Sequence, residues 1–298
     1  MMFHNRYLFA GTCLLLSLFV MAVAGPFIPY VKDGIEGSRV LFPERGVIET
    51  APFPPSADFP TGSDREGRNL ISVLVMGAKD TLTVIFCIAL IRYTFGIILG
   101  TIASFKGRFL SNLLNIWDQT FSSLPVIFFT ILFLNLPFLI FLETRFWVVI
   151  ISIALVEVGR VGVLIRDQLI QIKGTPYVEA GIVVGLKPIG LAKNYYLPNL
   201  LPTLIVNFCF DVGRVALIIG QLGIFSIFVT QEFVQLGAGW GEIRNTSFNW
   251  PTILGEARKD IYTAIWIPIN AAVAIMFVVF TFNILGEGLR KYFHRLGA

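Results

Sequence analysis

Charged residues are scarce in this 298-residue chain, at 14% of the total, where an ordinary soluble domain has about 25%. Two His and three Cys are present, and they form neither a CxxC pair nor a cluster with metal-ligand spacing. The chain lacks the Gly-x-x-x-x-Gly-Lys-Ser/Thr loop that cradles nucleotide phosphates, and it shows no Ser/His/Asp set. No basic patch is interleaved with aromatic residues. We therefore expect neither an enzyme nor a metal or cofactor site, and no nucleic-acid partner.

Long apolar segments are abundant instead, since 55% of the residues are hydrophobic. A helix of roughly 20 apolar residues crosses the ~30 Å hydrocarbon core of a bilayer. Only helices satisfy their backbone groups in lipid unless a barrel closes, and period-2 alternation is absent. The sequence predicts an all-α membrane protein with about six transmembrane helices. The six segments lie at about 7–24, 70–105, 109–141, 146–170, 199–229 and 261–286.

The first apolar segment is open to two interpretations. Its end, Ala22-Val-Ala24, has the small residues of a signal-peptidase site. The apolar run is longer than the 7–15 residues usual for a signal peptide, and more hydrophobic segments follow it. An uncleaved first span is therefore the simpler interpretation, with a cleaved signal peptide as the alternative.

The segment between the first two apolar runs is polar and rich in proline, which indicates an extramembrane loop. The predicted organisation has three parts. They are a first transmembrane helix at 1–30, an extracytoplasmic loop at 31–69, and a core membrane domain at 70–298. Within the core we expect five transmembrane helices, a short helix at about 176–187 and a second extracytoplasmic loop at about 230–260.

The charges on the connecting segments predict the orientation. Ten basic and three acidic residues fall on the side of the N-terminus, and nine basic and twelve acidic residues fall on the other. The outer basic residues lie mostly in the two long loops, which are translocated regardless of their charge. We therefore expect both termini to be cytoplasmic.

The polar segment at 171–198 carries the signals of a short helix on this cytoplasmic side. Thr175 is suited to the N-cap and Pro176 to the first helical position. Glu179 falls near the positive end of the helix dipole. Pro188 disfavours helical geometry at Lys187, so we expect the helix to stop there.

A helix this short is marginal alone in water, so something must pack on it. By i, i+4 spacing, one face holds Ala180, Gly181, Val184 and Gly185. Two glycines in a short helix are destabilising, and they usually permit close approach of another backbone. The pattern alone leaves two partners open: a soluble protein, or the membrane helices of the same chain.

The same segment resembles a known motif. Glu179-Ala180-Gly181, three residues, Gly185, nine residues, Tyr195, one residue and Leu197-Pro198 have the spacing of the EAA motif. That motif marks the permeases of bacterial ATP-binding-cassette importers. Gly181 stands in place of the second Ala, and Tyr195 in place of an Ile.

Four more segments resemble the C-type permease subunits of the dipeptide, oligopeptide and nickel importer family. They are Thr61 to Asn69, Trp117-Asp118 to Leu124-Pro125, Trp250-Pro251 to Ala257-Arg258, and Asn283 to Arg290. The stretch from Gln221 to Thr230 and the long loop after it depart from the family pattern of Phe-Leu-Gly-Leu-Gly and a short loop. Together the resembling segments cover most of the chain, and they occur in the same order as in the family.

The resemblance implies a type I importer permease fold with a cytoplasmic coupling helix between the fourth and fifth spans, in a bacterial inner membrane. It implies a permease subunit that forms half of a path for peptides or similar small solutes. The implied partners are a second homologous permease subunit, two cytoplasmic ATP-binding subunits and an extracytoplasmic solute-binding protein. The residues expected to contact the ATPase are Tyr177, Glu179, Ala180, Gly181, Val184, Gly185 and Leu186.

Five charged residues fall within or near the apolar segments, where charge is costly and usually functional. They are Arg92, Glu157, Arg160, Asp211 and Arg214. The spacing i, i+3 allows Glu157 to pair with Arg160, and Asp211 with Arg214, each on its own helix. Local neutralisation is one interpretation, and the wall of a translocation path is the other.

The resemblance places the fifth span on the translocation path, and Pro125 is expected to kink the third span toward it. The residues expected along this path are Asp118, Pro125, Asn207, Asp211 and Arg214. Two other functions stay open from the sequence: a secondary transporter that works without an ATPase, and a membrane scaffold that keeps the fold without transporting.

Overall fold

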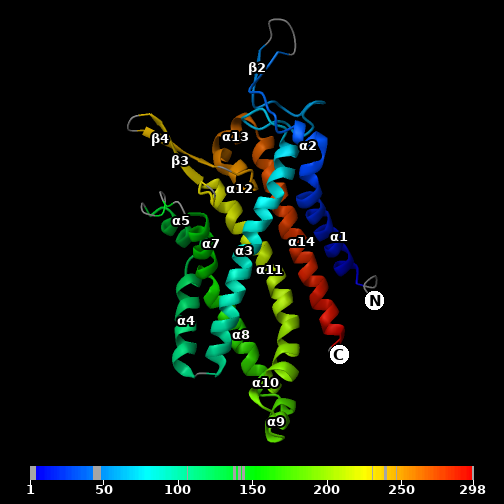
Figure 1. Cartoon of the computed structure of the whole chain (residues 1–298), viewed down its shortest axis with the longest axis vertical. Helices are drawn as coiled ribbons and strands as arrows, with labels where there is room; N and C mark the ends of the chain where they lie inside the picture. Colours follow the sequence, from blue (N-terminus) through cyan, green and yellow to red (C-terminus); the bar gives the residue numbers. More distant parts are fainter. Residues whose placement is uncertain are drawn as a thin grey trace.

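The computed structural model describes residues 5–42, 48–105, 107–136, 139, 142, 145–229, 231–237, 240–245 and 247–296, without the side chains of 231–236, 240–245 and 296. Most of these residues are helical (Figure 1). The helices are α1 (Arg6–Ala24), α2 (Pro29–Asp33), α3 (Leu70–Phe105), α4 (Arg108–Ser122), α5 (Val126–Leu134), α7 (Arg145–Val156), α8 (Val158–Lys173), α9 (Pro176–Val183), α10 (Pro188–Leu191), α11 (Leu197–Ile224), α12 (Trp250–Ile253), α13 (Ala257–Thr263) and α14 (Trp266–Leu296). A π-helical turn, Ala192–Tyr196, joins α10 to α11, and 3₁₀ turns lie at Gly25–Phe27 and Leu254–Glu256.

Four continuous segments of the described chain are long and apolar enough to cross a membrane. They are Arg6–Phe27, Leu70–Phe105, Pro188–Ile224 and Trp266–Arg295. Two bent helix pairs pass the same test together: α4 with α5, bent by 87°, and α7 with α8, bent by 43°. The structure therefore has four to six membrane-spanning units, in agreement with the predicted all-α membrane fold.

The break between α4 and α5 is sharper than the kink that the sequence predicts. Pro125 has extended backbone angles, with φ −55° and ψ 130°, and α5 begins at the next residue, Val126. Proline has no N–H to donate to the preceding turn, so α4 cannot continue through it. The predicted third span is thus two helices at nearly a right angle. The second bend falls at Glu157, which caps α8 with φ −105° and ψ 10°.

Small residues bring the first and last long helices together, as is common between helices in lipid. A Cβ added to Gly11 would lie 2.7 Å from the Cα of Leu285, and one on Gly288 would lie 2.5 Å from the backbone nitrogen of Leu8. The side-chain amide of Asn5 donates to the carbonyl of Gly288 at 2.7 Å. The first span is therefore packed tightly against α14.

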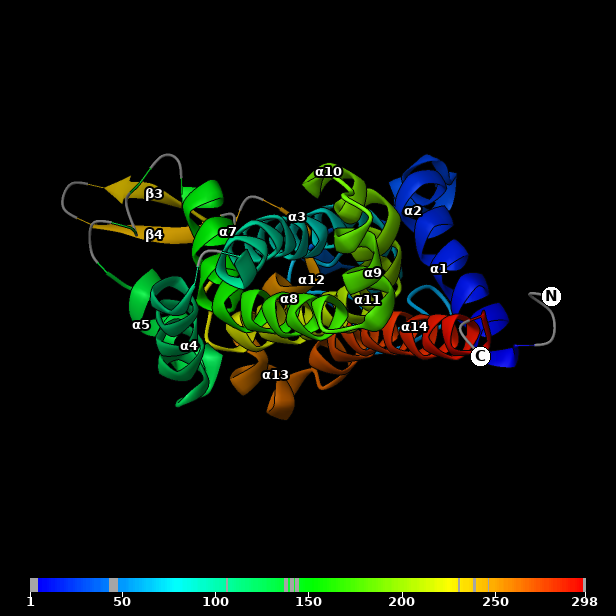
Figure 2. The same cartoon turned by 90° about the horizontal axis from the view of Figure 1, so that it is seen from below.

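The long helices lie in a row when seen from below. One side is formed by α1 and α14, the opposite side by α4 and α5, and α3, α8 and α11 lie between them (Figure 2). Along the axes of the long helices, the loops lie mainly at one end of the bundle and α9 lies at the other. Helix α1 begins toward the α9 end, and α14 finishes toward it (Figure 1). This agrees with an even number of passes through the membrane.

Two small antiparallel sheets lie at the end opposite α9 (Figure 1). Strand β1 (Val40–Leu41) pairs with β2 (Glu49–Thr50), and β3 (Gln231–Gly237) pairs with β4 (Trp240–Asn245). These strands fall within the segments predicted as extramembrane loops, which the sequence analysis left without regular structure.

An ion pair joins the two extramembrane segments at this end. Nε of Arg65 donates to Oδ1 of Asp260 on α13 at 3.1 Å, and a second guanidinium nitrogen contacts the other oxygen. Burial raises the pKa of Asp260, and the charge and hydrogen bond of Arg65 oppose that rise. The loop before α3 and the segment before α14 therefore form one connected surface.

Candidate functional site

The first candidate site is α9, which lies beyond the ends of α8 and α11 (Figure 1). The helix starts at Pro176, as predicted, with Thr175 in the N-cap position. The Thr175 hydroxyl donates to the carbonyl of Ile172 at 2.5 Å, and no side-chain capping bond is formed. The start of the helix is therefore fixed mainly by the backbone preference of proline.

The helix ends at Val183, earlier than the predicted end near Lys187. Gly185 adopts a positive φ of 83°, which is the left-handed conformation typical of a helix C′ position. The N–H of Leu186 then donates back to the carbonyl of Gly181 at 3.1 Å. The terminator is Gly185, and Pro188 only starts the next short helix.

The four residues predicted to share a face of α9 do not do so. Gly181 is buried, and a Cβ there would meet the side chains of Tyr195 and Leu191 at 3.0 and 3.2 Å. The Gly181 side thus packs on the chain's own segment before α11. Val184 is 82% exposed, and Gly185 lies past the helix with open space around it. The prediction from i, i+4 spacing was wrong because α9 ends at Val183, before Val184 and Gly185.

The remaining predicted contact residues divide in the same way. Tyr177 stacks on Tyr195 with ring centroids 5.8 Å apart, and Leu186 is half-buried. Glu179 and Ala180 are exposed. Beside these residues the outer surface carries an exposed apolar cluster. We call it the α9 tip patch, and it consists of Ile182, Val183, Val184 and Ile189, exposed by 55%, 86%, 82% and 82%.

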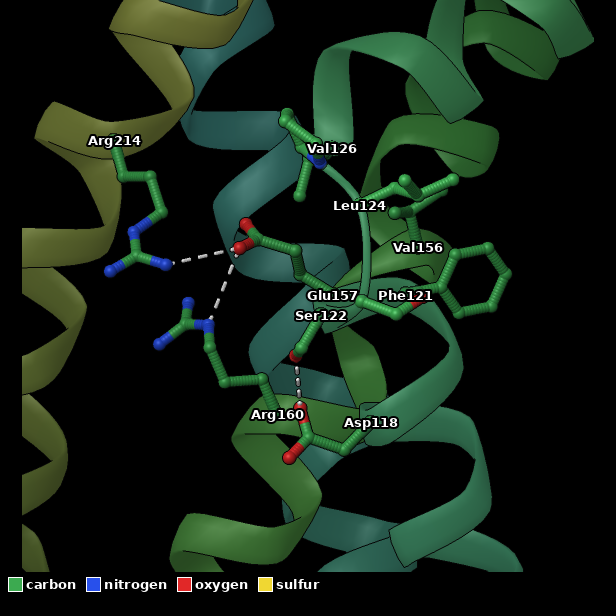
Figure 3. Close-up of a pocket in the computed structure, with 11 residues that line it drawn as sticks. Asp118, Phe121, Ser122, Leu124, Val126, Val156, Glu157, Arg160 and Arg214 are labelled. Atoms are coloured by element: carbon green, nitrogen blue, oxygen red, sulfur yellow. Dashed lines mark hydrogen bonds and ion pairs between the residues drawn. The ribbon is translucent and has the colours of Figure 1, made fainter.

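The second candidate site is a cavity of about 420 Å³ where both bent helix pairs break (Figure 3). Its walls come from the end of α4, the start of α5, the junction of α7 with α8, and α11. The lining residues are Asp118, Phe121, Ser122, Ser123, Leu124, Pro125, Val126, Val156, Glu157, Arg160 and Arg214.

Arg92 lies behind this cavity and connects three helices. Its side chain is fully buried on α3. Nη1 lies 2.7 Å from Oε2 of Glu157 and 3.0 Å from both carboxylate oxygens of Asp211. Nη2 donates to the carbonyl of Ile153 on α7 at 3.1 Å. A fully buried guanidinium is tolerated here because two carboxylates and a carbonyl surround it.

The other two arginines lie on the cavity side of the same cluster. Arg160 contacts Asp211 through Nη2 and lies 3.4 Å from Oε1 of Glu157 through Nε. Arg214 donates to Oε1 of Glu157 at 3.2 Å. The predicted pair of Glu157 with Arg160 on one helix is therefore present. Asp211 and Arg214 do not pair with each other as the spacing allowed, because each turns to a charged partner on another helix.

The structure brings together most of the residues predicted for the translocation path. Asp118, Pro125 and Arg214 line the cavity, and Asp211 is buried beneath Arg160. Asn207 is not among the described residues that line it, and its amide donates to the carbonyl of Thr203 on the same helix.

Three charged residues of the site were absent from the predicted path. Arg92, Glu157 and Arg160 supply most of the ion pairs around the cavity. Each was visible in the sequence as a charge inside an apolar segment, which was the available signal. Their mutual placement depends on how the helices are rotated against one another, and spacing along the chain does not give that.

The comparisons with known proteins agree with this architecture. Residues 93–296 match the family model of the binding-protein-dependent transport system inner membrane component. The chain is 29% identical to the dipeptide transport system permease protein DppC of Bacillus subtilis (strain 168), over 96% of this chain and 81% of the relative. It is 26% identical to the oligopeptide transport system permease protein OppC of Haemophilus influenzae, over 97% of this chain and 84% of the relative. It is also 26% identical to the probable D,D-dipeptide transport system permease protein DdpC of Escherichia coli (strain K12), over 80% of this chain and 74% of the relative.

The family model covers more than half of the chain, and these relatives align with most of it. Together with the apolar helices, this makes the chain a multi-pass bacterial membrane protein of the permease type. The chain belongs to the family of binding-protein-dependent transport system inner membrane components.

Proposed function

We propose that this chain is the permease subunit of an ATP-driven importer, forms half of the path for short peptides or a similar small solute, and is driven through α9 by a separate ATPase. The observation that carries the proposal is the α9 tip patch. Its residues belong to α9, the residue after it and α10, and α9 forms the end of the molecule in Figure 1; each of the four apolar side chains is more than half exposed. Exposed apolar clusters of this kind mark binding surfaces in soluble surroundings.

The other face of α9 supports a mechanical role. Val178 is fully buried, and the rings of Tyr177 and Tyr195 stack. The helix is therefore fastened to the segment that continues through a π-helical turn into α11. A push on the tip patch would be transmitted to α11, which carries Asp211 and Arg214 at the cavity.

The orientation and the partners complete the proposal. The α9 end is cytoplasmic, as the excess of Lys and Arg near the short loops on that side predicts. There the tip patch meets one of two ATP-binding subunits. A second homologous permease subunit completes the path, and the two extramembrane segments at the opposite end meet a solute-binding protein outside the membrane.

A charge on the tip patch tests the coupling. We expect Val183→Asp to reach the membrane at the wild-type level, because the Val183 side chain is 86% exposed and contributes little to folding. Seating a carboxylate unpaired in an apolar groove costs about 1–3 kcal/mol or more. We therefore expect at least a tenfold loss of solute-stimulated ATP hydrolysis by the complex co-expressed with its ATPase subunits.

The matched control is His294→Asp, which adds the same charge on an exposed side chain in the last turn of α14, away from both the tip patch and the extramembrane segments. It should leave the stimulated hydrolysis unchanged. Wild-type hydrolysis in Val183→Asp would exclude α9 as the input of the motor. Solute uptake into proteoliposomes without any ATPase would instead favour a secondary transporter.

A further inference from the structure

The cluster behind the cavity contains more positive than negative charge. Among the residues that the structure describes, Arg92, Arg160 and Arg214 share two carboxylates, those of Glu157 and Asp211, which leaves one positive charge in excess. Every carboxylate in the cluster already contacts at least two arginines. An unneutralised charge at membrane depth is costly, so a further anion would be bound favourably.

The excess charge is placed on the cavity side. The side chain of Arg92 is 0% exposed, that of Arg160 is 30% exposed and that of Arg214 is 52% exposed. The exposure therefore rises from the centre of the bundle toward the open cavity. Arg214 uses Nη1 for Glu157, and Figure 3 shows the rest of its guanidinium turned away from that carboxylate. Of the three arginines, Arg214 is the most accessible to an incoming anion, and Arg160 is the next.

The start of α5, at the break after α4, also favours the binding of an anion in this cavity. The cavity is lined by Pro125 and Val126, which are the N-cap and the first residue of α5. No side chain caps this helix start. The N-terminus of a helix carries partial positive charge, and in transporters such half-helix ends receive anionic groups of the solute.

A negative group lines the same cavity. Asp118 on α4 accepts a hydrogen bond from the Ser122 hydroxyl at 3.1 Å, and Ser122 also lines the cavity. Within the part of the chain that the structure describes, Asp118 forms no ion pair. Figure 3 shows its carboxylate on the lower side of the cavity, below Ser122, and Arg214 on the other side. The cavity thus presents separate sites for a negative and a positive group.

We propose that this cavity binds the solute as a zwitterion, with its carboxylate on Arg214 and Arg160 and its ammonium group on Asp118. The inference rests on the proposed function in one respect, which is that the ligand is the transported solute. The volume of about 420 Å³ is at the small end of the ~300–1,000 Å³ typical of small-molecule sites. A short peptide fits that description in both charge and size.

The test measures binding, and it needs neither ATP nor an ATPase. The full-length chain in lipid nanodiscs is equilibrated with three labelled probes: dialanine, its C-terminal amide and its N-acetyl derivative. The amide removes the carboxylate charge, and acetylation removes the ammonium charge. A charge-assisted hydrogen bond lost at either end corresponds to about tenfold to a hundredfold in Kd. We expect dialanine to bind the wild-type chain at least tenfold more tightly than either derivative.

Two variants assign each end of the probe. Arg214→Gln should abolish the preference for dialanine over the amide and keep the preference over the acetylated probe. Asp118→Asn should do the reverse. A merely structural defect would weaken all three probes together. The control Arg290→Gln removes an exposed arginine that pairs with Glu287 near the C-terminus, and it should keep both preferences.

The outcomes separate this inference from the proposed function. Equal Kd values for the three probes, no saturable binding of dialanine, or preferences retained in Arg214→Gln would overturn the zwitterion site. Tighter binding of the acetylated probe than of dialanine would indicate a site for simple anions and would also overturn it. Val183→Asp should bind dialanine as the wild type does. Failure of the coupling test at α9 would therefore leave the zwitterion site intact. Failure of the binding test would likewise leave the coupling through α9 intact.

Discussion

Replacing Asp211 with Leu is expected to destabilise the folded protein by about 3–5 kcal/mol, the loss typical when one partner of a buried ion pair is removed. Asp211 is 2% exposed and accepts from Arg92 and Arg160. Without it, three arginines share Glu157 alone, and the fully buried Arg92 keeps one carboxylate. The measurement is the unfolding curve of the purified protein in increasing SDS, followed by circular dichroism.

Two further variants make this result specific. Asp167→Leu removes a carboxylate that pairs with Arg166 at 2.8 Å on a side chain that is 51% exposed, so we expect a change of at most about 1 kcal/mol. The double variant Asp211→Leu with Arg92→Met removes one charge of each sign. It should recover much of the loss, since buried ion pairs can often be replaced by apolar groups. If Asp211→Leu and Asp167→Leu unfold alike, the cluster does not stabilise the fold.

The second large effect is expected at Gly77 on α3. A Cβ there would lie 1.8 Å from the carbonyl oxygen of Phe248, so Gly77→Val must push the backbone of the segment before α12 away. That segment is held by Trp250, whose N–H donates to the Thr81 hydroxyl at 2.9 Å and whose indole donates to the carbonyl of Leu74 at 2.7 Å. Overpacking of this kind costs about 3 kcal/mol when the neighbour is backbone.

Hydrogen–deuterium exchange of a peptide covering 247–256 measures this displacement. In the wild type the amide of Trp250 is protected by its bond to Thr81, and in Gly77→Val we expect it to exchange at least tenfold faster. The control is Gly190→Val, because a Cβ at Gly190 meets only a Leu186 methyl group at 3.8 Å. Equal protection in Gly77→Val and wild type would show that the segment accommodates the side chain.

Much of the fold could be read from the sequence, because long apolar runs have few options in lipid. The start of α9 was also predictable, since Thr175 and Pro176 act locally. The end of α9 was not predictable, because the sequence pattern does not show whether a glycine adopts the left-handed or the helical conformation. Gly185 was assigned to the helix, and the structure gives it a positive φ. The 87° bend at Pro125 was likewise foreseen only as a kink, since proline fixes where a helix stops and packing fixes the angle.

The candidate site divides in the same way. The charges within apolar segments were visible in the sequence, and the pair of Glu157 with Arg160 followed from its spacing. The link from Arg214 to Glu157 joins different helices, so local spacing could not supply it. The central role of Arg92 was hidden for the same reason, because its partners lie on α7, on α11 and at the start of α8.

The separation of Arg92 from Asp211 along the chain has a consequence for how the protein is made. The two residues are 119 positions apart, and Glu157 also follows Arg92 in order of synthesis. When α3 leaves the ribosome and enters the bilayer, its arginine has no counter-ion, at a cost of about 2.5–3.5 kcal/mol on biological insertion scales. The strongly apolar residues around Arg92, with a mean hydropathy of 2.2 over an 18-residue stretch of α3, supply the driving force for its insertion. The ion pair between Arg92 and Asp211 can form only after α11, the fifth apolar segment, has been translated. Until then the buried charge of Arg92 is incompletely neutralised.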